Sequence, residues 1–232
     1  MEILAVIPGR KGSKGVINKN IRKINNKPLI SYSIEAALNS KHIKRVVVSS
    51  DSEEILEIAN SYNVESIERP EYLAQDDSST IDVIKHVLNV VNQTKDYFPE
   101  ILMLLQPTSP LRDANDIDSA VKMFLEDDSA DSLISVSKFN HNPFWSFKIE
   151  DKFLSPAFNE EFLNKRRQEL PELFLPNGAI YIIKTSELLE KNSFYVEKTK
   201  PFLMSEEKSL DIDTELDLKL VKCLINDKKE EK

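Results

Sequence analysis

The stretch from Gly9 to Asn20 gathers residue types that could bind phosphate. It holds three of the four glycines in the chain and the cations Arg10, Lys11, Lys14 and Lys19. Glycine lets a backbone approach a ligand closely, and cations together with backbone N–H groups can converge on several phosphate oxygens. The pattern is neither a Walker A loop nor a GxGxxG dinucleotide fingerprint. The alternative is a solvated basic loop, but the basic residues are a local exception in an acidic chain.

A second candidate for chemistry is the acid pair Asp211 and Asp213 near the other end of the chain. In an extended segment these side chains point to the same side, because strand side chains repeat every two residues. Two adjacent carboxylates repel each other unless a cation neutralises them, and Mg²⁺ is the hard divalent ion that accompanies nucleotide phosphates. The alternative is that both residues only precede the last helix, which Thr214 and Asp217 would open as a capping box.

Composition limits the classes of protein. The 232 residues are 41% hydrophobic, which fits one domain or one domain with an insertion. A net charge of −8 argues against binding to nucleic acid or to an anionic membrane. The single cysteine, Cys223, excludes an intrachain disulfide and is predicted to be a buried core thiol. We expect a cytoplasmic protein, since no leader pattern and no apolar run of about 20 residues is found.

Alternating strands and helices should position the two candidate sites. Short apolar runs predict strands at 3–7, 45–48, 64–67, 101–105, 133–137 and 177–183. Helical patterns begin near 28, 52, 79, 113, 186 and 214. This order predicts an α/β fold with a doubly wound, mostly parallel sheet. Ligands of such sheets bind beyond the carboxyl ends of the strands, where we expect Arg10, Ser50, Asp51, Gln106 and Ser137.

The alternation stops between residues 138 and 176, where aromatic residues, Arg166, Arg167 and several prolines occur. We interpret 138–176 as an insertion in a single domain whose core comprises 1–137 and 177–226. The insertion could contain two strands around 144–149. Its aromatic residues suit either a ligand pocket or a subunit contact.

Four segments in order make the chain similar to a known family. They are Ile7–Gly15 with Lys19-Asn20, Leu105–Arg112, Pro176–Ile182 and Asp211–Asp217. Together they resemble the acylneuraminate cytidylyltransferases, or CMP-sialic acid synthetases, and the resemblance extends from residue 3 to about 225. It implies a Rossmann-type fold like that of the nucleotide-diphospho-sugar transferases. It also implies an enzyme that joins CTP to a nine-carbon 2-keto-3-deoxy sugar acid, giving the CMP-sugar and pyrophosphate, and a homodimer with CTP and a nonulosonic acid as partners.

The resemblance also implies roles for individual residues. Lys19, Arg10 and Asp211 would be catalytic, with Lys19 stabilising charge at the α-phosphate. The nucleotide would be bound by Arg10, Lys14, Asn20, Arg69 and Thr80. The sugar acid would be bound by Gln106 and Asn177. Asp211 and Asp213 would hold Mg²⁺, with Mn²⁺ as an alternative ion. Arg167 is a candidate for the sugar carboxylate, because arginine pairs with carboxylates bidentately; the alternative is an ordinary surface arginine.

The insertion departs from the family pattern. Where the sialic-acid enzymes have basic residues that contact the sugar, this chain has the run His141–Phe147. Its aromatic character favours a more apolar acceptor, such as a diacetamido tetradeoxy acid of the legionaminic or pseudaminic type. Two other hypotheses remain. One is a synthetase for the eight-carbon sugar acid of lipopolysaccharide, and the other is a non-catalytic nucleotide-binding protein on the same fold.

Overall fold

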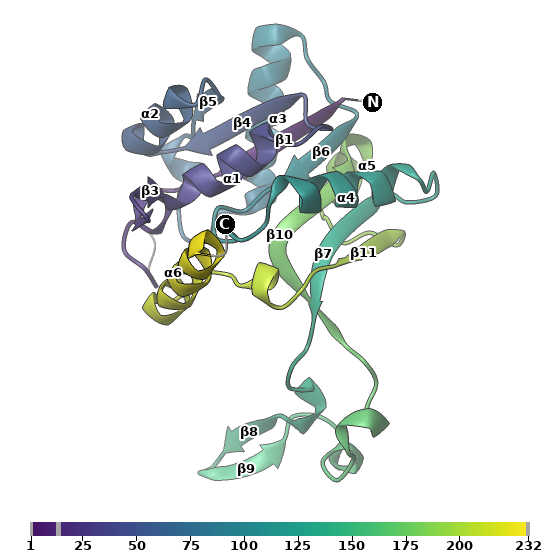
Figure 1. Ribbon diagram of the computed structural model, residues 1–232. Helices are drawn as coiled ribbons and strands as arrows, with labels where there is room; N and C mark the ends of the chain where they lie inside the picture. The colour runs from purple at the N-terminus through teal and green to yellow at the C-terminus, as the bar shows by residue number, and fades with distance from the viewer. Residues whose placement is uncertain (1, 13–14, 231–232) are drawn as a thin grey trace.

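The protein is described here by a computed structural model, which covers residues 2–12 and 15–230. A seven-stranded sheet forms its centre, in the order β11-β7-β10-β6-β1-β4-β5 (Figure 1). These strands are β1 (Ile3–Pro8), β4 (Arg45–Ser50), β5 (Glu65–Glu68), β6 (Ile101–Leu104), β7 (Ser132–Lys138), β10 (Phe174–Lys184) and β11 (Thr199–Leu203). Two small ribbons pair β2 (Lys23–Ile24) with β3 (Lys27–Pro28) and β8 (Phe147–Glu150) with β9 (Phe153–Pro156).

The directions of the strands confirm the predicted doubly wound, mostly parallel sheet. β1 runs parallel to β4 and β6, β4 to β5, and β7 to β11. β10 runs antiparallel to both of its neighbours, β6 and β7. β11 was not predicted, because its sequence TKPFL is short, partly polar and interrupted by Pro201. A proline that cannot donate a hydrogen bond is tolerated on an edge strand, which is where β11 lies.

Helices cover both faces of the sheet. They are α1 (Leu29–Leu38), α2 (Glu53–Ser61), α3 (Thr80–Lys95), α4 (Ala114–Leu125), α5 (Thr185–Lys191) and α6 (Glu215–Glu230). Short 3₁₀ turns are η1 (Lys19–Ile21), η2 (Glu71–Leu73), η3 (Pro143–Trp145), η4 (Glu160–Phe162), η5 (Arg167–Glu169) and η6 (Glu207–Ser209). None of the helices in the part of the chain covered by the structure is long and apolar enough to cross a lipid bilayer.

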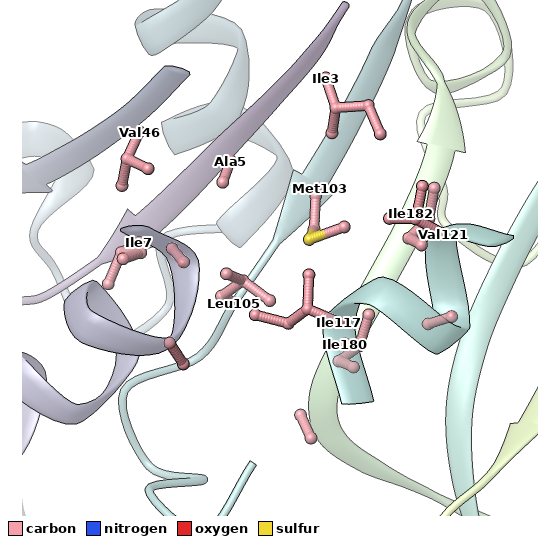
Figure 2. Packing of buried hydrophobic residues seen from close by; sticks show 14 of the residues in the cluster. Ile3, Ala5, Ile7, Val46, Met103, Leu105, Ile117, Val121, Ile180 and Ile182 are labelled. Atoms are coloured by element: carbon pink, nitrogen blue, oxygen red, sulfur yellow. The ribbon is translucent and has the colours of Figure 1, made fainter. Parts of the chain in front are cut away.

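The sequence of β1 shows why the sheet is buried on both faces. Ile3, Ala5 and Ile7 pack against α1, α2 and α4, whereas Leu4 and Val6 pack against α3 on the other face. Successive side chains of a strand point to opposite faces, so a strand covered twice must be apolar throughout. Figure 2 shows the first of these two cores, where β1 and β6 meet residues of α4 and β10.

A third apolar cluster lies under α6 and joins the two ends of the chain. Val16 of the opening loop packs there with Ile212, Leu218 and Val221, all of them buried. The predicted capping box is present, since the Thr214 N–H donates to Asp217 (2.7 Å) and the Asp217 N–H donates to the Thr214 hydroxyl (3.2 Å). The cluster therefore holds the opening loop beside the segment that contains the acid pair.

Apolar spacing predicts that Leu216, Leu220, Val221, Leu224 and Ile225 pack inward from the last helix, and for α6 this prediction is partly wrong. Leu216 and Leu220 are 64% and 46% exposed, and the Cys223 thiol is exposed rather than buried. The apolar stripe that packs inward begins at Leu218 and continues through Val221. Leu216 and Leu218 point about 200° apart around the helix axis, so only one of them can face inward, whereas Val221, Leu224 and Ile225 pack in the cluster as predicted.

Residues 139–173 form an arm that projects away from the sheet between β7 and β10 (Figure 1). Every residue of β8 is exposed. The aromatic run packs within the arm itself: the Phe144 ring stacks on Phe162 with 4.3 Å between centroids and meets Phe158 edge-on at 5.2 Å. Trp145 Nε1 donates to the backbone oxygen of Phe162 (3.1 Å). These rings thus stabilise the arm, whereas Phe147 is 47% exposed.

Candidate active site

A cleft of about 460 Å³ opens at the carboxyl ends of β1 and β6. This is the edge at which ligands bind in open α/β sheets. The cleft is lined by the predicted site residues Arg10, Lys19, Asn20, Arg69, Thr80, Gln106, Asp211 and Asp213. They come from five separate segments, so the fold assembles one site from residues about 200 positions apart in sequence. Lys14, also predicted, lies outside the described residues.

The opening loop and the acid pair are in direct contact. Lys19 Nζ donates to the Ile212 backbone oxygen (2.5 Å) and to Asp213 Oδ1 (3.0 Å). Gly15 lies so close to this segment that a side-chain carbon added there would collide with the Asp213 backbone oxygen. Position 12 favours glycine for another reason, because its φ of +70° is a left-handed conformation that glycine adopts easily. The loop glycines therefore serve both close approach and backbone shape.

Arg10 and Asn20 shape the front of the loop. Arg10 Nη1 donates to Asp76 Oδ1 (2.8 Å) and to the Gln75 backbone oxygen (3.4 Å). Asn20 is buried, and its Nδ2 donates to the Arg10 backbone oxygen (3.0 Å). Asn20 thus holds the loop backbone, while the Arg10 guanidinium is held at the wall of the cleft. The sequence did not single out Asp76. The observation that could have indicated it is an acidic residue in the same stretch as Arg69 and Thr80.

A buried cation lies deeper in the cleft. Arg69 is 6% exposed, and its Nη2 donates to the Ser49 backbone oxygen (2.8 Å). Burial lowers the pKa of Arg69 to about 10, against an opposing effect of Asp51, so the guanidinium stays charged at neutral pH. Thr80 begins α3 at the same wall, where Ser79 Oγ accepts from the Ile81 N–H (3.1 Å). The N-terminal end of a helix adds positive potential, so this wall suits an anionic or electron-rich ligand.

The acid pair fits a hard divalent ion. Burial raises the pKa of Asp211, and the nearby Asp213 carboxylate raises it further, although the Thr108 side chain opposes the rise. Among the described residues, Asp211 Oδ1 is buried without a hydrogen-bond partner. Mg²⁺ is commonly held by one or two carboxylates together with phosphate oxygens and water. No group of three or more His, Cys, Asp or Glu residues in the described ranges is arranged to hold a metal, so such an ion would complete its coordination with phosphate and water.

The predicted sugar-binding residues are placed differently from one another. Gln106 lines the cleft, and its Oε1 lies against Gly178, where an added side-chain carbon would come within 2.8 Å. Asn177 is buried, accepts from the Ser135 hydroxyl (2.5 Å) and donates to Ser209 Oγ (2.9 Å). Its amide is engaged in the hydrogen bonds of the core, and Asn177 is not among the residues that line the cleft.

Arg167 is not brought to the cleft within one chain. It lies in η5 of the arm and lines a separate cavity of about 350 Å³ with Lys138, Asn142 and Glu172. Lys138 and Glu172 form an ion pair across the base of the arm. The cleft of a single chain therefore has the cations and acids expected for a nucleotide, but not the arginine expected for the sugar carboxylate.

Comparison with known proteins shows that most of the chain is similar to cytidylyltransferases, the family that the sequence motifs resemble. The chain is 37% identical to the N-acylneuraminate cytidylyltransferase of Escherichia coli O18:K1:H7, over 94% of this chain but only 51% of that protein. It is 38% identical to the CMP-N,N'-diacetyllegionaminic acid synthase of Legionella pneumophila, over 97% of both chains. A CMP:2-keto-3-deoxy-manno-octonic acid synthetase, solved with CTP, superimposes with a TM-score of 0.72 at 16% identity, covering 98% of this chain and all of that one. The last similarity shows the fold alone.

A sequence model of the cytidylyltransferases matches residues 4–226, which include β1, the opening loop, the acid pair and most of α6. That span contains every residue that lines the cleft. The chain belongs to the cytidylyltransferase family.

Proposed function

We propose that the protein is a cytidylyltransferase that activates a nine-carbon 2-keto-3-deoxy sugar acid with CTP, giving the CMP-sugar and pyrophosphate. The observation that carries the proposal is the contact between the cationic opening loop and the acid pair, through Lys19, Asp213 and Gly15. A polyphosphate needs cations on one side, and a divalent ion held by carboxylates can bind its oxygens on the other. The cleft offers both within one chain.

At the α-phosphorus the reaction forms one bond and breaks one, and the acceptor hydroxyl loses its proton. The anomeric hydroxyl oxygen of the sugar acid attacks the α-phosphorus, the bond from that phosphorus to the bridging oxygen breaks, and pyrophosphate leaves with its electron pair. The hydroxyl proton is released, and no side chain is assigned as its acceptor. Because the phosphorus is already activated, catalysis consists chiefly of positioning and charge stabilisation.

The described residues can divide these tasks. Arg10 at the cleft wall would bind the outgoing phosphates, and Lys19 would neutralise the charge that develops at the α-phosphate. Arg69 and Thr80 line the part of the cleft left for the base and ribose. Asp211 and Asp213 would hold Mg²⁺ or Mn²⁺, which would supply Lewis-acid activation of the phosphate.

The acceptor half of the site is supported by the arm. Ile149 and Leu154 lie opposite each other on β8 and β9 and are 79% and 67% exposed. Apolar side chains exposed to this extent mark an interface. We infer a homodimer in which the arm of one protomer brings Arg167 to the cleft of the other. The CTP requirement also supports a cytoplasmic location.

For the acceptor we favour a diacetamido acid of the legionaminic or pseudaminic type over N-acetylneuraminate. The match to the Legionella synthase covers nearly all of both chains, whereas the match to the E. coli enzyme covers half of that protein. The aromatic run of the arm no longer supports this choice, since Phe144 and Trp145 are used in packing within the arm. The eight-carbon acid remains the second candidate acceptor, on the fold similarity described above.

The test is a pyrophosphate-release assay with each of the four ribonucleoside triphosphates. Each is combined with N,N'-diacetyllegionaminic acid, pseudaminic acid, N-acetylneuraminic acid or the eight-carbon acid, with Mg²⁺, with Mn²⁺ or with a chelator. We expect turnover only with CTP and a divalent ion, and fastest with a diacetamido acid. Equal or faster turnover of N-acetylneuraminate would overturn the choice of sugar. Absence of turnover with every pair would overturn the proposed activity.

A further inference from the structure

The segment from Ser205 to Asp213 places the acid pair, yet none of its residues belongs to the sheet. After β11 the chain leaves the edge of the sheet and forms the short turn η6. It then reaches Asp211 without further regular secondary structure. A segment of this kind has no ladder of hydrogen bonds to fix it, so its position depends on individual contacts. The individual contacts of residues 205–213 therefore set the distance between Asp211 and the opening loop.

One of these contacts is an ion cluster centred on Lys208. Its Nζ lies 2.9 Å from Asp113 Oδ2 and 2.8 Å from both oxygens of Asp116. The Lys208 side chain is 26% exposed and that of Asp116 is 14% exposed, so part of the ion cluster is shielded from water. The two acidic partners raise the pKa of Lys208 against the opposing effect of burial, which keeps the ammonium group charged at neutral pH.

The two acids are themselves fixed by α4. Asp113 caps the helix, and its Oδ1 accepts from the N–H groups of Asn115 (2.9 Å) and Asp116 (3.1 Å). Asp116 returns the contact by accepting from the Asp113 N–H (2.9 Å). This is a complete capping box, which does not need a lysine. Lys208 therefore bonds to acids that are already held in place, and its own segment is what the contact positions.

Two further contacts attach the segment on either side of Asp211, in addition to the bonds of Lys19 to Ile212 and Asp213. Ser209 Oγ accepts from Asn177 Nδ2 (2.9 Å), and the Ile212 N–H donates to the Thr108 backbone oxygen (3.0 Å). Thr108 and Asp113 belong to the same connection between β6 and α4. The acid segment is thus attached through Lys208 and Ile212 to the connection that also contains Gln106, and through Ser209 to Asn177 of β10.

We propose that Lys208 is a positioning residue for the acid pair: its ion pairs with Asp113 and Asp116 hold the segment 205–213 where Asp211 and Asp213 can share a divalent ion. Lys208 does not line the cleft and touches no reacting atom. The role given to the acids rests on the proposed function. Removal of the ammonium group leaves Asp113 and Asp116 repelling each other at the site where the segment is anchored.

The test compares Lys208→Met, Lys208→Arg and the matched control Lys200→Met. Lys200 makes an ion pair of the same kind with Asp127 (2.8 Å) and is 31% exposed, but it lies on β11 outside the acid segment. Binding of Mn²⁺ to the protein without nucleotide is measured from the electron paramagnetic resonance of the free ion. Thermal unfolding, the KM for CTP and kcat at saturating Mg²⁺ are measured on the same samples.

We expect Lys208→Met to raise the Kd for Mn²⁺ about tenfold, the lower end of the range for partners that orient metal ligands. Lys208→Arg should restore Mn²⁺ affinity to within about threefold of wild type, and Lys200→Met should leave it unchanged. An unchanged Kd in Lys208→Met, or an equal loss in Lys200→Met, would overturn the proposal. So would a wild-type protein that binds no Mn²⁺. Metal binding that responds as expected, in a protein without pyrophosphate release, would support the positioning role and refute the proposed activity.

Discussion

The sheet and the arm of this protein use apolar residues in opposite ways. In the sheet, β1 and β6 are apolar because helices cover both faces, and the residues of β6 are all buried. In the arm, β8 and β9 expose Ile149, Phe153 and Leu154 to 67% or more. The sheet is covered on both faces, whereas the arm presents an apolar surface that nothing in the described part of the chain covers.

The same difference divides the site. The residues expected to bind the nucleotide and metal converge on one cleft at the edge of the sheet. Arg167, expected to bind the acceptor, lies on the arm and lines a different cavity. The difference suggests that one chain can bind CTP but that two chains are needed for the acceptor. The following predictions test this division, beginning with the largest effect.

Lys19→Ala should lower kcat by about 10²–10³-fold, because the ammonium group contacts the acid segment and would neutralise charge in the transition state. Pyrophosphate release measured at saturating CTP checks this. Lys23→Ala removes the same charge from the exposed ribbon strand β2 and should leave kcat unchanged. Loss of unfolding cooperativity in Lys19→Ala would instead assign Lys19 to stability alone.

Gly15→Ala should lower kcat/KM for CTP by about 10²-fold, because the new methyl group would push the opening loop away from Asp213 by a distance that misaligns the reacting groups. Steady-state kinetics with varied CTP provide the measurement. The control is Gly12→Asn, since asparagine tolerates a positive φ and none of the described residues beyond the chain neighbours lies within 4 Å of the added carbon. Equal losses in the two variants would show that loop flexibility, rather than the Asp213 contact, sets the rate.

A double change in the arm, Ile149→Glu with Leu154→Glu, should convert the proposed homodimer into a monomer that still binds CTP. Both side chains lie on the same face of the hairpin, and four charges facing each other in a symmetric contact repel. Light scattering gives the mass, and calorimetry gives the affinity for CTP. We expect the KM for the acceptor to rise about tenfold or more, and Leu38→Glu, at an exposed position of α1, to change none of these quantities. Weakened CTP binding in the monomer would contradict the division between sheet and arm.

The smallest effect concerns the stability of the cleft without metal. The pKa of Asp211 is raised above its ordinary value of 3.8 in the folded state. At pH values between the ordinary and the raised pKa, Asp211 therefore binds more protons in the folded protein than in the unfolded chain. Stability due to this group is therefore present at low pH and is lost as the pH rises through that window. Asp211→Asn should raise Tm slightly at pH 7 in a chelator, and the gain should disappear towards pH 3.5. Scanning calorimetry at the two pH values checks the sign, and a gain that grows on acidification would contradict it.

Much of the sheet could be predicted from the sequence, and the reason is local. A strand buried on both faces must be apolar throughout, so a continuous apolar run such as residues 101–105 predicts a buried strand. β11 has no such run, because an edge strand needs neither continuous apolar residues nor every N–H. The exposed Leu216 and Leu220 show the same limit, since helical spacing does not reveal which stripe faces inward.

The site residues that belong to sequence motifs could be predicted. The contacts between segments that are distant in sequence could not. The sequence indicated Arg10, Lys19, Asp211 and Asp213 by type and spacing. It could not show that Lys19 bonds to the Ile212 backbone or that Arg10 pairs with Asp76, because these contacts join residues 66 to 194 positions apart. Nor could it show that the amide of Asn177 is engaged within the core.

The place where the arm joins the sheet has a consequence for the evolution of the protein. Lys138 and Phe174 are paired partners on β7 and β10, and the Phe139 N–H donates to the Leu173 oxygen (3.1 Å). The chain therefore leaves and re-enters the sheet at neighbouring positions, because β10 runs opposite to β7. The two ends of the arm are thus held together by the sheet itself, so a change of length within the arm need not displace β7 or β10. Under the proposed arrangement, residues of the arm that meet the acceptor could change in evolution while the residues that line the cleft stay the same.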